Sequence, residues 1–195
     1  YRFRFMAPEN LDRTPIQIIK KYDIVMIDQS ESASKAIPDS LALAIQSYVK
    51  SGGSFIIVAD SGYRKIGRPD TLGWIANFDI LAPVDCQQNK DYTRPCEFPM
   101  PIQGVLENVD PSNTVFSGLD RVPATITDAT SLPFTTYDIN PIGDEWMTIQ
   151  DVGPSGKTYP GIVFRRAGLG KVIYFNYNEI GMAPEVLDRV FNYLS

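Results

Sequence analysis

The chain has 195 residues, which is enough for one domain with a buried core. Its net charge is −5 and its pI is near 4.8, so an acidic surface disfavours nucleic acid and anionic membranes as partners. No apolar run approaches the roughly 20 residues of a membrane helix, so we expect no insertion into a bilayer, and the lack of histidine removes the commonest catalytic base.

The chain begins with a pattern of strands and helices. Arginine alternates with aromatic residues and Met over residues 2–6, which predicts a short strand, and a weak helical turn follows over residues 15–21. Residues 23–28 and 54–59 form two short, largely apolar runs, typical of strands covered on both faces. Together with the segment between them, these runs predict a βαβ unit.

The segment between the two strands predicts a helix. Pro38 suits the first helical turn, an apolar stripe contains Leu41 and Ile45, and Gly52 and Gly53 provide a left-handed cap at the end. A second helix is predicted over residues 70–78.

The character of the chain changes between residues 80 and 152, where prolines are frequent. Short strands are predicted at residues 101–106, 123–127 and 146–152. Residues 161–166 and 170–175 then predict a hairpin, and a last helix begins at Pro184. We therefore expect a single domain over residues 1–195 with a β-rich elaboration at 80–152. Because the chain starts abruptly on Tyr1, we also expect it to be part of a larger protein.

The two cysteines, Cys86 and Cys96, flank one polar loop. This spacing favours a disulfide over two unrelated thiols, and two cysteines without histidine are a poor zinc site. A disulfide implies an oxidising compartment, so the expected location is extracellular or a membrane-anchored ectodomain.

Three stretches resemble the class I glutamine amidotransferase-like superfamily: residues 22–28, the helix end and strand after Ala44, and residues 168–175 with the helix that follows. The resemblance implies a flavodoxin-like α/β fold, a three-layer sandwich with a mostly parallel sheet. It also implies a catalytic cysteine at a strand-to-helix elbow and a late histidine. Here the elbow reads Asp60-Ser61-Gly62 and the late stretch ends at Glu179, with no histidine in the chain. A thiol–imidazole mechanism is therefore impossible with this chain alone.

The predicted site lies at the carboxyl ends of the parallel strands, where open α/β sheets bind ligands. Its candidate ligand-binding residues are Asp28, Asp60, Ser61, Gly62, Tyr63 and Glu179. Asp28 and Asp60 could hold a ligand or a metal ion, or could simply cap loops. Ser61 is a weak candidate nucleophile, and a turn residue is the alternative.

The favoured interpretation is a non-catalytic domain without a cofactor that binds a protein or a small ligand at this edge. The alternative is a hydrolase that uses Ser61 or a metal ion held by Asp28 and Asp60. Self-association into a homo-oligomer stays open.

Overall fold

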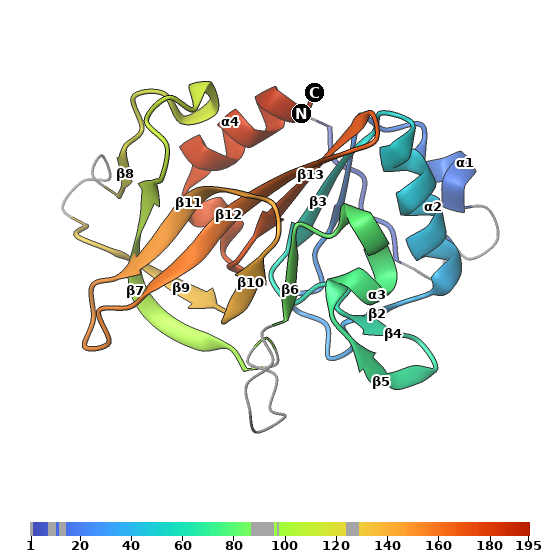
Figure 1. Cartoon of the computed structure of the whole chain (residues 1–195), viewed down its shortest axis with the longest axis horizontal. Coiled ribbons are helices and arrows are strands. Elements are labelled where there is room, and N and C mark those ends of the chain that lie inside the picture. Colours follow the sequence, from blue (N-terminus) through green and yellow to red (C-terminus); the bar gives the residue numbers. More distant parts are fainter. Residues whose placement is uncertain (1, 8–10, 12–14, 87–95, 97, 124–128) are drawn as a thin grey trace.

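The protein is described by a computed structural model covering residues 2–7, 11, 15–86, 96, 98–123 and 129–195, with only the backbone described for residues 68–72. Within these residues the largest sheet has the strand order β1-β3-β13-β12-β11-β7-β8, and β9 pairs with β7 (Figure 1). Its strands are β1 (Ile24–Ile27), β3 (Ser54–Val58), β7 (Met100–Asn108), β8 (Arg121–Val122), β9 (Leu132–Thr136), β11 (Asp144–Asp151), β12 (Thr158–Ala167) and β13 (Gly170–Phe175).

One half of this sheet is parallel. Strand β3 lies between β1 and β13 and runs parallel to both, with Ser54 opposite Ile24 on one side and Lys171 on the other. Helix α2 (Asp39–Lys50) connects β1 to β3 and ends before Gly52, whose φ of 111° suits glycine. This is the predicted βαβ unit, and it confirms an α/β fold of the flavodoxin-like kind.

The other half is antiparallel. Strands β13, β12, β11 and β7 each run opposite to their neighbour, and β8 and β9 pair with different parts of β7. The predicted terminal hairpin is β12–β13, and the predicted strands at residues 101–106 and 146–152 lie within β7 and β11. The strand predicted at residues 123–127 falls almost wholly outside the described residues.

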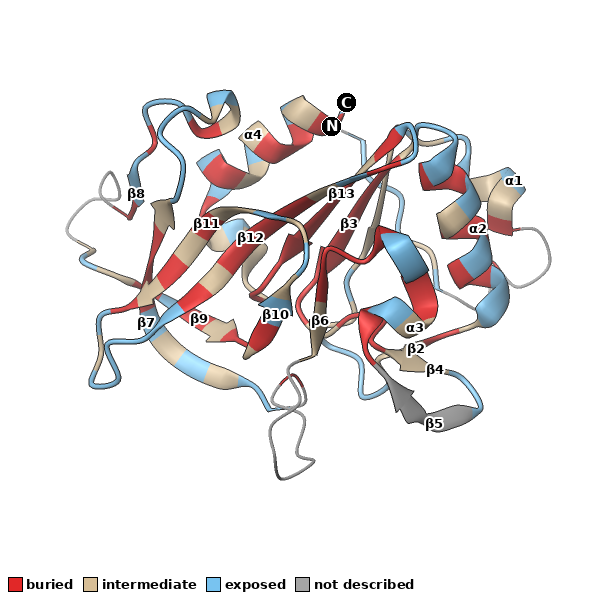
Figure 2. Ribbon diagram, viewed as in Figure 1, coloured by how far each residue is buried: buried red, intermediate tan, exposed pale blue. Residues whose placement is uncertain are grey.

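Helices cover both faces of the sheet. Trp74 of α3 (Trp74–Phe78) packs edge-on against Tyr174, whereas Tyr193 of α4 (Pro184–Leu194) packs against Phe164, which pairs with Ile173. Since Ile173 and Tyr174 are consecutive on β13, they point to opposite faces, and so α3 and α4 lie on opposite sides. The buried positions concentrate on β3, β12 and β13 between these layers (Figure 2).

Smaller elements complete the structure. They are α1 (Pro15–Ile19), β2 (Ala36–Ile37), β4 (Arg64–Lys65), β5 (Arg68–Leu72), η2 (Asp79–Leu81), β6 (Val84–Cys86), η4 (Thr114–Phe116), β10 (Ile139–Pro141) and η5 (Ile180–Met182). Strands β2, β4 and β5 form a small lobe beside α3, and β6 pairs with β10. No helix in the described part is both long and apolar enough to cross a bilayer.

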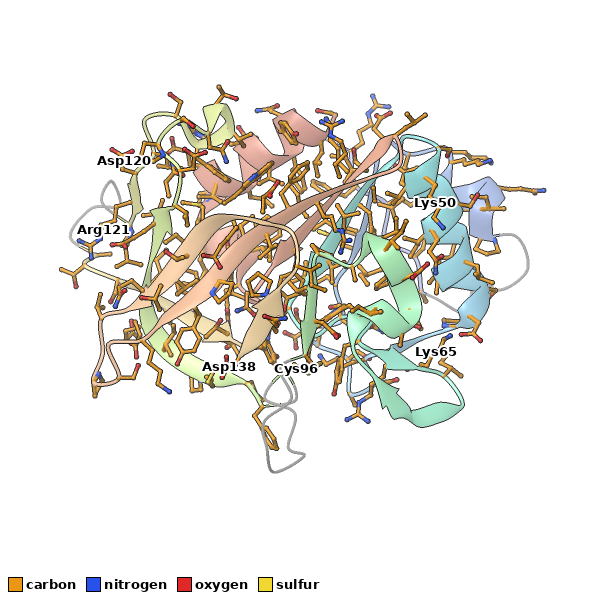
Figure 3. The ribbon with its side chains drawn as sticks, viewed as in Figure 1. Lys50, Lys65, Cys96, Asp120, Arg121 and Asp138 are labelled. Atoms are coloured by element: carbon orange, nitrogen blue, oxygen red, sulfur yellow. A yellow bond between two sulfur atoms is a disulfide. The ribbon has the colours of Figure 1, made fainter. Side chains whose placement is uncertain are left out.

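The predicted disulfide is confirmed. Cys86 at the end of β6 is bonded to Cys96, with the two Cα atoms 5.3 Å apart (Figure 3). Cys96 is fully buried, so the bond fastens one end of the intervening loop to the core.

Two expected elements differ from the structure. The helix predicted over residues 70–78 begins only at Trp74, because residues 68–72 pair with β4 and Gly73 turns the chain with a φ of 101°. Residues 2–6 form no strand. Phe5 is 90% exposed, and Phe3 is 60% exposed with its ring beside Phe191, so the segment has no apolar face buried against a sheet.

Candidate functional site

The predicted site lies where the parallel strands end. Asp28 follows β1, Ala59 and Asp60 follow β3, and Asn178 and Glu179 come shortly after β13. Because these three strands are neighbours and run in the same direction, their carboxyl ends meet at one edge (Figure 1).

The elbow after β3 has alanine at its strained position. Ala59 has a φ of 49°, a left-handed conformation that is uncommon for a residue with a side chain. Its amide donates to the Phe175 carbonyl at 2.7 Å, and the Ser61 amide donates back to Val58 at 3.0 Å, which closes a tight turn. In a nucleophile elbow such a strained turn presents the reactive side chain. Here it presents a buried methyl group.

Ser61, the candidate nucleophile, faces inward. The residue is fully buried, and its hydroxyl oxygen accepts the Gln29 backbone N–H at 2.7 Å. Its carbonyl accepts the indole N–H of Trp74 at 3.0 Å. The serine thus joins the ends of β1 and β3 to α3, which is the role of a turn residue.

Asp60 is held by a lysine that the sequence did not single out. Lys35 Nζ lies 3.3 Å from Asp60 Oδ1 and donates to the carbonyls of Gln29 and Ser30 at 2.5 and 3.2 Å. Both side chains are largely buried, 14% and 13% exposed. Burial raises the pKa of Asp60, and the Lys35 charge opposes that rise. Lys35 is thus engaged by two backbone carbonyls and by the charge of Asp60.

Tyr137 lies among the polar residues of this edge. Its side chain is close enough to Asp60 and Asn178 for both to influence its ionisation. Burial, followed by the neighbouring Asp60 charge, raises the pKa of Tyr137 to about 12. The tyrosine therefore stays neutral at physiological pH.

Asp28 forms hydrogen bonds with a neighbouring residue of its own loop. Its Oδ1 accepts the Ser30 amide at 3.0 Å and the Ser30 hydroxyl at 2.5 Å, and that hydroxyl lies 3.3 Å from Asn178 Oδ1. This is an Asx turn, the capping role that the sequence left open for aspartate. Asp28 and Asp60 thus have separate partners among the described residues.

Gly62 and Tyr63 also support the turn. Gly62 has a φ of 68°, its amide donates to Gln29 Oε1 at 2.8 Å, and a Cβ there would lie 2.7 Å from Ile27 Cδ1. Tyr63 is 5% exposed and packs against Trp74, with the Arg64 guanidinium over its ring. Both residues therefore serve packing.

Glu179 turns toward β9. Its carboxylate accepts the Thr135 amide at 3.0 Å and the Thr135 hydroxyl at 2.8 Å. It lines a depression of about 340 Å³ formed with β7, β9 and the end of β11. Of the predicted residues, it is the one that reaches this hollow.

No three histidine, cysteine, aspartate or glutamate side chains in the described part of the chain are grouped to hold a metal ion. The residues that the sequence analysis missed are Gln29, Lys35, Ala59, Thr135, Tyr137 and Asn178. Gln29 and Asn178 are adjacent to chosen positions and could have been included on that ground. Lys35, Thr135 and Tyr137 lie in stretches without a recognisable motif, and the backbone strain at Ala59 leaves no trace in the sequence.

No protein-family model matches the chain, and no curated protein matches it. Solved structures share its fold. A β-galactosidase from Rahnella sp. R3 superposes with a TM-score of 0.60 at 13% identity over 90% of this chain. A cytoplasmic protein from Salmonella typhimurium gives 0.57 at 18% over 92%, and a ThuA-like protein from Bacteroides uniformis gives 0.53 at 13% over 92%.

The matched proteins are longer than this chain. The chain spans 23% of the β-galactosidase, 73% of the Salmonella protein and 71% of the ThuA-like protein. At these identities the likeness concerns the fold, and that fold is the one implied by the resemblance to the amidotransferase-like superfamily.

The comparison corrects the expected location. Two matched proteins of Salmonella typhimurium are described as cytoplasmic, which contradicts an extracellular or membrane-anchored ectodomain. That expectation depended on a cysteine pair and on the residue at which the chain starts. Neither feature is a targeting signal.

Proposed function

We propose that this chain is a non-catalytic, amidotransferase-like domain that binds a ligand at the carboxyl edge of its sheet. The observation that carries the proposal is Ala59. The side chain of this strained residue has no heteroatom. The position from which a nucleophile would attack therefore carries a methyl group.

The polar residues around the elbow also support a non-catalytic role. Ser61 Oγ is buried and already accepts a backbone N–H, and Lys35 is committed to two carbonyls and Asp60. A serine nucleophile needs access to substrate and a base that can take its proton. Neither requirement is met at Ser61.

The comparisons support the superfamily part of the proposal. The ThuA-like protein aligns with almost the whole chain, and the β-galactosidase carries the same fold within a much longer polypeptide. A fold that recurs inside larger proteins is compatible with a domain that binds or assembles.

The test is covalent labelling. Intact protein is incubated with a fluorophosphonate and, separately, with iodoacetamide. Each product is then digested, and any labelled residue is mapped by mass spectrometry. Hydrolysis of p-nitrophenyl acetate is followed in parallel for the wild type and Ser61→Ala. We expect no adduct on Ser61 and equal hydrolysis by both proteins. A phosphonylated Ser61 peptide, or turnover that disappears in a folded Ser61→Ala variant, would overturn the proposal.

A further inference from the structure

The depression beside Glu179 is lined by both apolar and polar residues. It is about 340 Å³ in volume and is lined by three prolines, Ile102, Phe134, Gly153 and four polar residues. The polar residues are Gln103, Thr135, Asp151 and Glu179, and the prolines are Pro101, Pro133 and Pro154.

The register of β7 and β9 explains which side chains form the floor of the depression. Pro101 lies opposite Thr135, and Gln103 lies opposite Pro133, so these four side chains share one face of a two-stranded ribbon. Proline is tolerated in both strands because the ribbon is an edge of the sheet there. The rings of proline add rigid apolar surface that loses little entropy when it is covered.

The charge of the depression is negative. Asp151 and Glu179 are the only ionisable residues among the described residues that line it, and these include no arginine or lysine. Asp151 accepts the Gly153 amide at 2.8 Å and the hydroxyl of Ser155, and these bonds lower its pKa. Both carboxylates are fixed in place by their donors, Glu179 by Thr135 and Asp151 by the turn that follows it.

Each carboxylate retains acceptor capacity. An ionised carboxylate has about four lone-pair sites, and Glu179 and Asp151 each accept two hydrogen bonds from the described residues. A donor with a positive charge could use the remaining sites of a group that is already held in position. A preorganised acceptor of this kind loses little freedom on binding.

We propose that this depression binds an organic cation, in which an ammonium or guanidinium group is carried on a short apolar body. The cation would be placed at Glu179, with the buried charge of Asp151 adding to the attraction, and the apolar body would cover Pro101 and Pro133. The inference rests on the proposed binding role of this edge and specifies its ligand. An anionic ligand is disfavoured, because the described residues that line the hollow would offer it two carboxylates and no cation.

The experiment is an NMR titration of the ¹⁵N-labelled chain with 2-phenylethylamine and, as the uncharged counterpart, 2-phenylethanol. We expect the amine to shift the amides of Thr135, Gly153 and Glu179. We expect the alcohol, which offers the same ring without the charge, to bind about fivefold more weakly. Raising the salt concentration should weaken only the binding of the amine.

Two variants locate the charge. Glu179→Gln keeps an acceptor for Thr135 but removes one negative charge, and should weaken amine binding about fivefold. Asp110→Asn is the matched control, because Asp110 is an exposed turn aspartate that accepts from Ser112 and does not line the depression. Its affinity for the amine should equal that of the wild type.

The outcomes separate the inference from the proposed function. Amide shifts for neither probe, equal affinity for amine and alcohol, or equal weakening by both variants would each overturn the cation site. None of these results restores a nucleophile at Ala59 or Ser61, so the non-catalytic proposal is decided by labelling alone. If Glu179→Gln is unstable, Asp151→Asn provides the same test, because asparagine can still accept the Gly153 amide.

Discussion

The parallel and antiparallel halves of the sheet use their polar residues in different ways. At the carboxyl edge of β1, β3 and β13, the polar groups contact one another: Lys35 pairs with Asp60, Tyr137 lies near Asp60, and Ser61 accepts the Gln29 backbone N–H. At the end of the β7–β9 ribbon, two carboxylates instead line a hollow. The polar groups of the parallel half thus contact mainly one another, whereas the hollow is lined mainly by strands of the antiparallel half together with Glu179, which follows β13.

The two tryptophans give the largest expected contrast between the halves. Trp74 is fully buried, packs against Tyr174 and donates to the Ser61 carbonyl, so Trp74→Ala should lower the free energy of unfolding by about 4 kcal/mol. Trp146, on β11, is only half-buried although it stacks on Phe164. Trp146→Ala should cost about 2 kcal/mol.

Urea unfolding followed by circular dichroism measures both values. Trp74→Phe keeps most of the apolar area and leaves the Ser61 carbonyl without its donor, so it should retain most of the stability and lose about 1 kcal/mol. Equal losses for the two alanine variants would mean that the parallel half is not the better-packed one.

The sequence predicted the parallel half more completely than the antiparallel half, for a physical reason. Parallel strands of α/β proteins are near-continuous apolar runs, so residues 23–28 and 54–59 were recognised almost to their ends, although β1 at the edge of the sheet is only half-buried. The helix predicted over residues 70–78 was started too early. Its first residues belong to β5, an edge strand whose pairing with β4 leaves no periodic signal in the sequence. Local patterns report burial along one segment, and they do not report which segment pairs with it.

The site shows the same division. Asp28, Asp60 and Ser61 were located at the correct edge, since strand direction alone places them there. Their partners could not be predicted, because Lys35 and Tyr137 come from loops and strands whose position depends on tertiary packing. The depression joins residues more than 70 positions apart, such as Pro101 and Glu179, and no local motif links them.

Removing Lys35 should have the next largest effect. Lys35→Met leaves the Asp60 charge largely buried without its cation, so we expect a loss of about 3 kcal/mol at pH 7. Lys65→Met is the control, because Lys65 pairs at 3.2 Å with Asp39, which is 58% exposed, and should cost less than about 1 kcal/mol.

A double variant sharpens this test. Asp60→Asn combined with Lys35→Met removes both charges, and should recover part of the loss caused by Lys35→Met alone. If the double variant is as unstable as the two single changes summed, the pair does not interact as the structure indicates.

Tyr137 gives a prediction that depends on pH. Its pKa is raised to about 12 in the folded protein, so the unfolded chain loses this proton first as the pH rises above 10. The stability that Tyr137 contributes is therefore fully present below pH 10 and is lost as the pH rises toward 12. Between pH 9 and 11 the wild type should lose about 1 kcal/mol more than Tyr137→Phe. Equal pH slopes for the two proteins in urea titrations would place Tyr137 in solvent.

The smallest expected effect concerns the elbow itself. Ala59→Gly removes a buried methyl group, which costs about 0.8 kcal/mol, and frees the unfolded backbone, but it also relieves about 1–2 kcal/mol of left-handed strain. These terms nearly cancel, so the free energy of unfolding should change by less than about 0.5 kcal/mol.

Ala42→Gly, at an equally buried position in α2, has no strain to relieve and should cost about 1.5 kcal/mol. The difference between the two alanines in urea unfolding measures the strain that this elbow still holds. A loss at Ala59 as large as the loss at Ala42 would mean that the turn is relaxed, and Ala59 would then not mark the position from which a nucleophile is missing.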